Sequence, residues 1–440
     1  MLKIYSPDEA KQSILKRIPL DDMPISPGLL VSIEKIFNAP LTPEEAVRRI
    51  LMDVRKMGDK GLQKWSERLD GLRADTFRVP VDEIQAAKEI VPEDVLSALA
   101  IAKERIFRFY RNQPVSSWIM QDGDGTLGQL VRPIQRVGLY VPGGTAPLPS
   151  SVLMSGIPAR VAGVKEIVMV VPPDKETGKI APIILAAAAL LDINEIYVLG
   201  GAQAIGAMAY GTETIAPVDK IFGPGNLFVT LAKRQVFGSV GIDGLAGPTE
   251  TMVIADETAN PDWVAADLLA QAEHDILASA ILLTSLKTLA EAVQSAVAEQ
   301  AVKLPRVDIL VQSLATNSGI IITESLEESV NLANDYAPEH LCLTVSQPFS
   351  LSEKIYSAGG IFVGDYSYEV LGDYVAGPSH VMPTNGTARF ASPLNVLDFV
   401  HLVSLVALDN SVSSELSEVA ALIARSEGLE AHARSADARR

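Results

Sequence analysis

The sequence predicts an α/β protein with two parallel-sheet domains, and three observations support this prediction. Apolar runs of strand length alternate with glycine- or proline-containing turns and helical segments, which is the order of parallel βαβ units. The alternation runs from residue 136 to 247 and starts again after residue 248. The chain has 440 residues, too many for one hydrophobic core.

Four strands are predicted in the first series, each ended by residues that a strand does not tolerate. They span 136–141, 166–171, 195–199 and 220–222. The alanine-rich segment 180–191 predicts a buried helix between the second and third strands. Parallel sheets bind ligands at the carboxyl ends of their strands, so we expect a ligand beside the turns that follow these strands.

The second series repeats this order and carries most of the candidate chemistry. Its strands are predicted at 251–256, 280–283, 319–323, 341–345 and 361–363. A long helix is predicted from about Asp262 to Asp275, between the first two of these strands.

The remaining segments complete the predicted domain organisation. Residues 1–35 are polar and interrupted by proline, which indicates an N-terminal arm. Helix-start signals at Thr42-Pro43 and Pro92-Glu93 predict helices in the segment that follows the arm. We assign 36–135 together with 248–390 to a first, discontinuous α/β domain, 136–247 to a second α/β domain that binds the cofactor, and 391–440 to a helical tail.

Composition argues against several classes of protein. The net charge of −17 argues against a nucleic-acid partner, because a protein that binds phosphates needs a basic surface. The longest apolar run, 181–191, is shorter than the roughly 20 residues that cross a bilayer, so no membrane partner is expected. We see no secretory signal, and the single cysteine, Cys342, excludes an internal disulfide. We therefore expect a cytoplasmic protein that handles small molecules.

Glu339 and His340 are the strongest local candidates for acid–base chemistry. They follow Ala337-Pro338, and Pro338 both ends the preceding helical segment and biases Ala337 toward extended geometry. The pair is therefore expected on a helix-to-strand elbow, where Glu can activate water and His can carry protons near neutral pH. Adjacent residues of these types also occur by chance, and the local sequence does not decide between the two interpretations.

All five histidines lie after residue 273, a distribution that favours one site built late in the chain. Gln271 and His274 are three residues apart on one helical face and could bind a divalent metal, although a helix-end histidine is the simpler interpretation. Asp373 and His380 lie in a predicted glycine- and proline-rich loop, which a rigid turn explains equally well.

Simpler interpretations also exist for the other candidates. His432 is expected to be solvated near the C-terminus, His401 to pack within a helix, and Cys342 to be a small buried hydrophobe. The glycine-rich turns at 200–206 and 223–226 could admit a pyrophosphate or a ribose by close backbone approach. They are weak signals, because neither a G-x-G-x-x-G turn after a strand nor a Walker sequence is present.

Taken together, the motifs resemble those of the L-histidinol dehydrogenase family, in order and across essentially the whole chain. The matching segments are Gly-Leu-Tyr-Val-Pro-Gly-Gly at 138–144, Phe-Gly-Pro-Gly-Asn at 222–226, Gly-Pro-Thr-Glu at 247–250, Ala-Gln-Ala-Glu-His at 270–274, Ala-Pro-Glu-His-Leu at 337–341, Gly-Asp-Tyr at 372–374, Ser-His-Val-Met-Pro-Thr at 379–384 and Glu-Gly-Leu-Glu-Ala-His at 427–432. The resemblance implies two Rossmann-like parallel-sheet domains that lack the usual glycine fingerprint, with small helical segments at both ends. It also implies a homodimer with intertwined C-terminal tails.

The same resemblance implies oxidation of L-histidinol to L-histidine through L-histidinaldehyde, the last steps of histidine biosynthesis, with NAD reduced twice and one Zn2+ in each subunit. The implied catalytic pair is Glu339 and His340. The implied metal set is Gln271, His274, Asp373 and His432. Implied substrate contacts are these four residues with Thr249, His340, His380 and Glu427, and implied NAD contacts are Tyr140, Gln203 and Asn226. Glu427 and His432 are implied to complete the site of the partner subunit.

These residues suit a two-step oxidation in which the metal orients the substrate and NAD accepts the hydrides. His340 would take the alcohol proton, and Glu339 would activate water against the aldehyde. One alternative is a zinc hydrolase in which Glu339 activates a metal-bound water, and another is a non-catalytic protein that binds a small ligand. The two βαβ series argue against a hydrolase, because hydrolysis needs no dinucleotide. A protein that only binds a ligand would leave the Glu339–His340 elbow unexplained.

Overall fold

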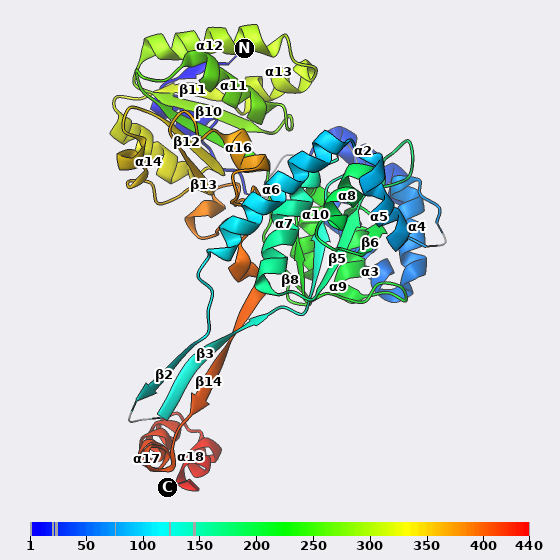
Figure 1. Ribbon diagram of the computed structural model, residues 1–440, viewed down its shortest axis with the longest axis vertical. Coiled ribbons are helices and arrows are strands. Elements are labelled where there is room, and N and C mark those ends of the chain that lie inside the picture. The colour runs from blue at the N-terminus through cyan, green and yellow to red at the C-terminus, as the bar shows by residue number, and fades with distance from the viewer. Residues whose placement is uncertain are drawn as a thin grey trace. The chain divides into compact units, whose positions relative to one another are not determined.

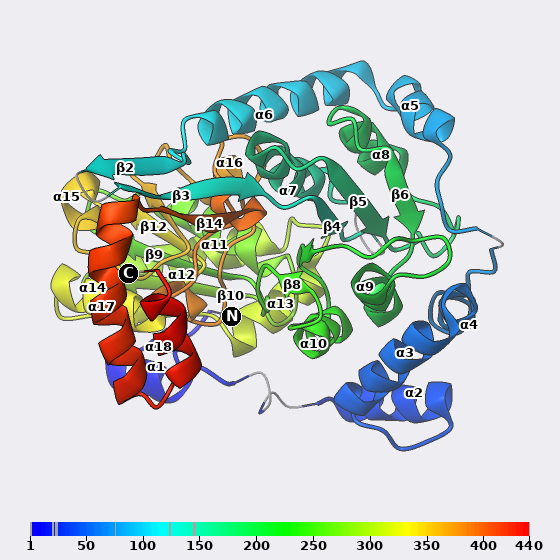
Figure 2. The same cartoon turned by 90° about the horizontal axis from the view of Figure 1, so that it is seen from below.

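The computed structural model describes residues 2–19, 22, 25–74, 76–122, 125–143 and 147–439. The chain forms two compact units. The larger contains Met1–Asn112 and Gln135–Asn395, and the smaller contains Gln113–Ile134 and Val396–Arg440. Figures 1 and 2 show their helices and strands from two directions. Within the larger unit, helices cover two separate parallel sheets, which confirms the predicted α/β class.

The first sheet has five parallel strands in the order β6-β5-β4-β7-β8. They are β4 (Arg136–Tyr140), β5 (Glu166–Val171), β6 (Glu195–Val198), β7 (Lys220–Phe222) and β8 (Gly241–Ile242), connected by α7 (Pro149–Ala162), α8 (Pro182–Ala189), α9 (Gly201–Tyr210) and α10 (Leu227–Val236). The first four strands are the predicted ones, whereas β8 has only two residues and gave no sequence signal. The order reverses between β4 and β7, where sheets of this kind open a ligand crevice.

The second sheet winds in the same way, with the parallel order β1-β11-β10-β9-β12-β13. Its strands are β1 (Ile4–Tyr5), β9 (Glu250–Ala255), β10 (Ser279–Thr284), β11 (Gly319–Ile322), β12 (His340–Thr344) and β13 (Gly360–Val363). Its helices are α1 (Pro7–Gln12), α11 (Pro261–Ala272), α12 (Lys287–Ala301), α13 (Val307–Thr316), α14 (Leu326–Tyr336), α15 (Pro348–Ser352) and α16 (Glu369–Tyr374). All five strands predicted for this series are confirmed.

Alternate residues of the second sheet face two different hydrophobic cores. On β9, Val253 and Ala255 pack with residues of α11 and α12, whereas Met252 and Ile254 pack with residues of α14. Because both faces are covered, every residue of β9 is buried. This two-sided burial explains why the strands appear in the sequence as continuous apolar runs.

The helices between residues 43 and 111 pack with the first sheet, not with the second as we assigned them from the sequence, and one helix of the predicted arm packs with them. They are α2 (Pro27–Phe37), α3 (Pro43–Met57), α4 (Asp59–Asp70), α5 (Val81–Ile90) and α6 (Glu93–Arg111). One hydrophobic core joins Leu51 and Val54 of α3 to Ile205 of α9, and α5 and α6 lie against α8 and α7. Gly206 permits the close contact, since a Cβ there would lie 3.1 Å from Leu51 Cδ2. An apolar stripe in the sequence shows that a helix packs on a core, but it does not show which of the two sheets the helix packs against.

The predicted N-terminal arm takes part in the second sheet. β1 pairs in parallel with β11, with Ile4 opposite Ile320. Ser6 and Glu9 form a reciprocal capping box at the start of α1. Of the arm, Met1 and positions 20, 21, 23 and 24 lie outside the described residues.

The smaller unit is a three-stranded antiparallel sheet followed by two helices. Its elements are β2 (Trp118–Asp122), β3 (Gly125–Pro133), the short helix η3 (Val396–Phe399), β14 (Val400–Ala407), α17 (Asn410–Ser426) and α18 (Glu430–Asp437), with the strands in the order β14-β3-β2. The tail is therefore not helical throughout. His401 lies on β14 opposite Arg132, not in a helix as predicted. In the part of the chain that the structure describes, no helix combines the length and the apolar character needed to cross a membrane.

Candidate active site

Glu339 and His340 follow α14 as predicted, but the backbone that leads to them differs from the prediction. Ala337 has φ 51° and ψ 66°, in the left-handed region, instead of the extended geometry expected before Pro338. Its N–H donates to the carbonyl of Ala333 and closes the helix. The turn leads directly into β12, and both side chains are buried, with 6% of Glu339 and 3% of His340 exposed.

Two hydrogen bonds in series lead from Gln271 to Glu339. Gln271 Nε2 donates to Thr249 Oγ1 at 2.8 Å, and Thr249 Oγ1 donates to Glu339 Oε2 at 2.6 Å. The backbone N–H of Glu250 donates to the same carboxylate oxygen at 3.0 Å. Burial raises the pKa of Glu339 to about 7, although His340 and these hydrogen bonds oppose the rise. A carboxylate with this pKa can take up and release a proton near neutral pH, as a general base must.

The hydrogen bonds of His340 determine which ring nitrogen is free. Nδ1 lies 3.1 Å from the backbone carbonyl of Glu250. Because a carbonyl only accepts, Nδ1 carries the proton and Nε2 keeps its lone pair. Nε2 is buried without a hydrogen-bond partner among the described residues, and Asp373 Oδ1 lies 3.7 Å from it. His340 therefore presents an unused basic nitrogen.

The expected metal ligands of the larger unit come from the ends of two helices. Gln271 lies in the last turn of α11, and its Oε1 is buried without a partner among the described residues. His274 follows that helix and is exposed. Desolvation lowers the pKa of His274, with Asp373 opposing, which favours the neutral imidazole that metals bind. Asp373 lies within α16, not in a loop as predicted.

These three residues fit an incomplete zinc site. Among the described residues, no group of three or more His, Cys, Asp or Glu side chains is placed to hold a metal ion. Gln271, His274 and Asp373 instead supply one amide oxygen, one imidazole and one carboxylate. The unpartnered Oε1 of Gln271 favours a cation, because an unsatisfied buried acceptor costs about 1–3 kcal/mol. The set lacks a fourth ligand within the larger unit.

His380 is held beside Asp373. Its Nδ1 donates to the Asp373 backbone carbonyl at 2.8 Å, and its Nε2 lies 3.4 Å from the Ser151 hydroxyl of α7. Desolvation lowers the pKa of His380, Asp373 opposes this, and His340 and His274 lower it further. The structure thus brings together the expected substrate contacts of the larger unit around His340.

Two further expected site residues lie in the smaller unit. Glu427 follows α17 and His432 lies in α18, and both are exposed. The roles of Glu427 as a substrate contact and of His432 as a metal ligand stay predictions.

The acid–base pair lies at the amino ends of its strands. Glu250 begins β9 and His340 begins β12, and the two strands are parallel neighbours. Thr249 and Glu339 immediately precede them. The side chains of the site therefore meet where two strands enter the sheet.

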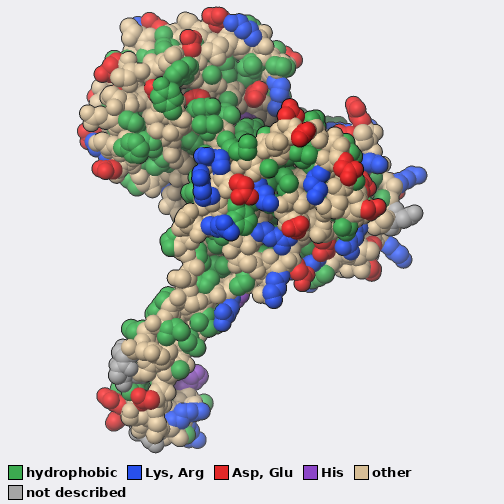
Figure 3. Space-filling view, viewed as in Figure 1, with side chains coloured by type: hydrophobic (Ala, Val, Ile, Leu, Met, Phe, Trp, Pro, Cys, Tyr) green, Lys and Arg blue, Asp and Glu red, His purple; other side chains and the backbone are tan. Residues whose placement is uncertain are grey.

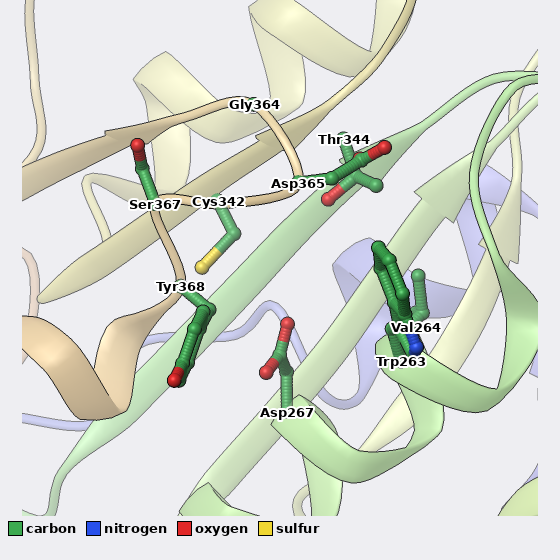
Figure 4. A pocket seen from close by; sticks show the side chains of 9 residues that line it. All are labelled: Trp263, Val264, Asp267, Cys342, Thr344, Gly364, Asp365, Ser367 and Tyr368. Atoms are coloured by element: carbon green, nitrogen blue, oxygen red, sulfur yellow. The ribbon is translucent and has the colours of Figure 1, made fainter.

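The other edge of this sheet contains a cavity too small for a dinucleotide. Figure 4 shows Cys342 and Asp267 at this cavity, which Thr344, at the carboxyl end of β12, also lines. Its volume of about 10 Å³ is that of a single water molecule. Burial raises the pKa of the Cys342 thiol well above its usual value, with nearby carboxylates adding to the rise. Cys342 is thus the small buried residue predicted, and a thiolate nucleophile is disfavoured there.

The three expected NAD contacts lie at the carboxyl edge of the first sheet, where a ligand was expected. Tyr140 ends β4, and its hydroxyl accepts from the Gly201 N–H at 3.2 Å. Gln203 is buried in the first turn of α9. Asn226 caps α10, its Oδ1 accepting from two backbone N–H groups at 3.1 and 3.2 Å. Positions 144–146, in the turn after β4, lie outside the described residues.

A buried ion pair holds the turn after β7 beside Tyr140. Lys233 and Asp243 pair with each other, and Gly223 donates to Asp243 Oδ2 at 2.7 Å and accepts from Lys233 Nζ at 3.0 Å. Gly223 has φ 109°, and a Cβ there would lie 2.0 Å from the Tyr140 carbonyl oxygen. Only glycine fits this position. The turn that carries Asn226 is therefore fixed in place before any ligand binds.

The sequence did not reveal the pair formed by Arg17 and Glu250. The Arg17 guanidinium binds both carboxylate oxygens of Glu250, lies over the Tyr336 ring at 3.5 Å, and donates to the Tyr336 carbonyl at 2.5 Å. Through its backbone, Glu250 holds Glu339 and His340. An acidic residue at the start of a buried strand was a usable signal for Glu250, whereas nothing in the sequence distinguishes Arg17.

A second missed residue is Glu369, which is buried next to His340. It accepts a short hydrogen bond from the Thr251 hydroxyl, and its Oε1 lies 3.7 Å from His340 Nδ1. Burial raises the pKa of Glu369 well above its usual value, and Asp373 adds to the rise. The imidazole of His340 is thus surrounded by three carboxyl groups, those of Glu339, Glu369 and Asp373.

Replacing Arg17 by Met is expected to destabilise the protein and to disturb the site. The change removes the guanidinium and leaves the 5%-exposed Glu250 carboxylate without its counter-ion. Breaking such a pair costs about 3 kcal/mol, which urea unfolding monitored by circular dichroism would measure. Arg73→Met is the matched control, because Arg73 pairs with Glu67 at the surface and its side chain is 83% exposed. An equal loss of unfolding free energy in both variants would show that the buried Arg17–Glu250 pair stabilises the protein no more than a surface pair does.

Comparisons with known proteins identify the family of this chain. The family model described as Histidinol dehydrogenase matches residues 38–440. A histidinol dehydrogenase of Deinococcus radiodurans is 48% identical over 440 residues, covering 100% of both chains. One of Moorella thermoacetica is 52% identical over 396 residues, covering 89% of this chain and 93% of its own. The crystal structure of histidinol dehydrogenase from Elizabethkingia anophelis superposes with a TM-score of 0.90 at 37% identity, covering 100% of this chain and 98% of that one. The chain therefore belongs to the histidinol dehydrogenase family.

Proposed function

We propose that the chain oxidises L-histidinol to L-histidine in two NAD-dependent steps, through L-histidinaldehyde, at the site formed by Glu339 and His340. The observation that carries this proposal is the unused Nε2 of a buried histidine next to a carboxyl group with a pKa of about 7. One group suits the removal of an alcohol proton, and the other suits the activation of water. Histidinol as the substrate follows from the family.

The first step uses His340. Nε2 takes the proton of the substrate's hydroxyl as the carbinol carbon loses a hydride, which produces the aldehyde. Nδ1 remains bonded to the Glu250 carbonyl, so the ring keeps its orientation while it is charged. NAD, when bound, supplies the hydride acceptor for this step and for the next.

The second step uses both residues. Glu339 takes a proton from a water molecule that attacks the aldehyde carbon, and the oxygen of that water becomes the second oxygen of the acid. His340, protonated in the first step, gives that proton to the aldehyde oxygen as the water adds, which forms the hydrate. It then takes a hydroxyl proton of the hydrate as the second hydride leaves. Thr249 and the Glu250 N–H keep the Glu339 carboxylate oriented during this transfer.

Zinc is proposed as the metal, with Gln271, His274 and Asp373 of one subunit as ligands and His432 of the partner subunit as the fourth. When bound, it would supply a positive charge that orients the polar groups of the substrate, without changing valence. The unpartnered Oε1 of Gln271 and the neutral imidazole of His274 support this assignment.

We also propose a homodimer in which the smaller unit forms much of the interface. Large apolar side chains of β2 and β14 are between 42% and 67% exposed: Trp118, Ile119, Met120, Leu402, Val403 and Val406. Helix α17 adds Leu416, Val419, Leu422 and Ile423, between 47% and 63% exposed. Figure 3 shows hydrophobic side chains on the surface of this unit. A surface of this kind is typical of one covered by a partner.

The single buried cysteine supports a reducing, cytoplasmic setting.

Mixing two inactive variants tests whether His432 serves the partner's site. His274→Ala and His432→Ala are each expected to be inactive, since each loses one metal ligand. After the two are dissociated and reassociated together, half of the dimers are mixed and each mixed dimer has one intact site, so about a quarter of wild-type activity should return. Activity is measured as histidinol-dependent reduction of NAD by absorbance. A mixture that stays inactive while mixed dimers are shown to form by mass would contradict the exchange.

The same assay tests the proposed reaction as a whole. Wild-type protein should reduce two NAD for each histidinol consumed and should release histidine. Absence of any histidinol-dependent reduction of NAD would contradict the proposal, and hydrolysis of histidine esters or amides would favour the zinc hydrolase alternative.

A further inference from the structure

Asp70 is hydrogen-bonded to a residue of the proposed NAD site, although it comes from α4, outside the strand–helix alternation of the first sheet. Its Oδ2 accepts from Gln203 Nε2 at 2.9 Å, and its charge acts on Tyr140. Asp70 is exposed, whereas Gln203 is fully buried. An accessible carboxylate therefore lies beside two of the proposed nucleotide contacts.

The hydrogen bond between Asp70 and Gln203 determines which groups this cluster offers to a ligand. An ionised carboxylate only accepts, so Gln203 turns its amide nitrogen toward Asp70 and its Oε1 away from it. That Oε1 is buried and has no partner among the described residues. Desolvation raises the pKa of Asp70 to about 6, with Gln203 opposing, so the carboxylate is mostly ionised above pH 7. The cluster is negative and rich in acceptors, which suits a ligand that donates hydrogen bonds.

The position of Asp70 is unfavourable for the free protein. It is the last residue of α4, at the negative end of the helix dipole, which disfavours a carboxylate. The Gln203 amide is the group that lowers the pKa of Asp70, against the desolvation that raises it. A ligand that donates to this carboxylate would compensate for its placement.

The residue at the usual place for ribose recognition is already used. Dinucleotide-binding sheets commonly carry an acidic residue at the end of their second strand, where it accepts from the ribose hydroxyls. Here Asp174 follows β5, and its Oδ1 accepts from the N–H groups of Glu176 and Thr177 and from the Thr177 hydroxyl. Asp174 thus stabilises its own turn, and the first sheet needs another carboxylate for a ribose.

We propose that the Asp70 carboxylate binds a ribose hydroxyl of NAD and selects NAD over NADP. The 2′-phosphate of NADP would bring a second anion against Asp70 and the acceptor oxygen of Gln203. Gln203 fixes the direction of the carboxylate through its amide nitrogen. The inference rests on the proposed function in taking NAD as the nucleotide.

The test compares wild type, Asp70→Asn and Asp70→Ser with the matched control Asp174→Asn. We expect wild type to favour NAD over NADP by at least about 100-fold in kcat/KM, and both Asp70 variants to lower this ratio by roughly tenfold or more. Calorimetry with 5′-AMP and 2′,5′-ADP should show weaker binding of the first and tighter binding of the second. Asp174→Asn should leave both the ratio and the two affinities as in wild type.

Three results would overturn the inference. They are an unchanged ratio in folded Asp70→Asn and Asp70→Ser protein, an equal change in Asp174→Asn, and an unchanged 5′-AMP affinity in the Asp70 variants. Calorimetry needs no histidinol, so it distinguishes this failure from failure of the proposed function. If the proposed function were wrong and this inference right, wild type would not reduce NAD with histidinol, yet it would still bind 5′-AMP more tightly than 2′,5′-ADP.

Discussion

Glu339→Gln protein is expected to oxidise histidinol to the aldehyde and then to stop. Glutamine keeps an oxygen that accepts from Thr249 and from the Glu250 N–H, so the surrounding geometry is preserved. It cannot take a proton from water, and the loss of a general base lowers the rate of a step by roughly 10²–10⁴-fold. The first oxidation uses His340 and should fall by much less.

Quenched-flow analysis with separate detection of aldehyde and histidine measures both steps. The variant should form aldehyde at close to the wild-type rate and almost no histidine, also when aldehyde is supplied directly. Glu327→Gln, an exposed position on α14, should behave as wild type. In wild type, the aldehyde step should slow as the pH falls below about 7, because the raised pKa leaves Glu339 protonated there. Equal loss of both oxidations in Glu339→Gln would contradict the division of labour.

His340→Asn protein is expected to lose both oxidations. The asparagine amide nitrogen occupies a position close to that of Nδ1 and can still donate to the Glu250 carbonyl, so the start of β12 should remain in place. The variant has no group at the position of Nε2, the nitrogen that accepts the proton each time a hydride leaves. We expect a fall of roughly 10³-fold in each half-reaction.

The measurements for His340→Asn are single-turnover rates with histidinol and with the aldehyde, together with the melting temperature and the affinity for NAD. Stability and NAD affinity should stay near wild type, since the nucleotide is proposed to bind at the first sheet. Retention of fast alcohol oxidation would show that another group takes the first proton, with Glu369 and Asp373 as the nearest carboxyl groups.

Much of the fold could be predicted from local sequence, because the signals come from residues that are buried on both sides of a sheet. β9 and β10 are buried throughout between two cores and are mostly apolar, so their ends were predicted to within one residue. The partners of amphipathic helices were not predictable in this way. α3 shows an apolar stripe, but its contact with Gly206 of α9 depends on a position more than 140 residues away. β14 was missed because much of its apolar surface is exposed in the single chain.

The site was predictable in its residue types but not in its geometry. Local sequence offered Glu339, His340, Gln271 and Asp373 as candidates, the resemblance assigned their roles, and the structure brings them together. The sequence did not indicate that they meet at the amino ends of β9 and β12. Nor did it reveal Arg17, which comes from the arm and reaches the site through a contact 233 residues distant in the chain. Contacts over such separations leave no periodic pattern to detect.

The most direct test of the account is the histidinol-dependent reduction of NAD before chelation, after chelation, and after return of zinc, with the metal content measured in each sample. The account predicts one zinc per chain at the start, loss of nearly all activity with the metal, and recovery of both when zinc is added. Gln271→Leu protein should bind little zinc under the same conditions. Metal-free protein that still converts histidinol to histidine at the original rate would contradict the account.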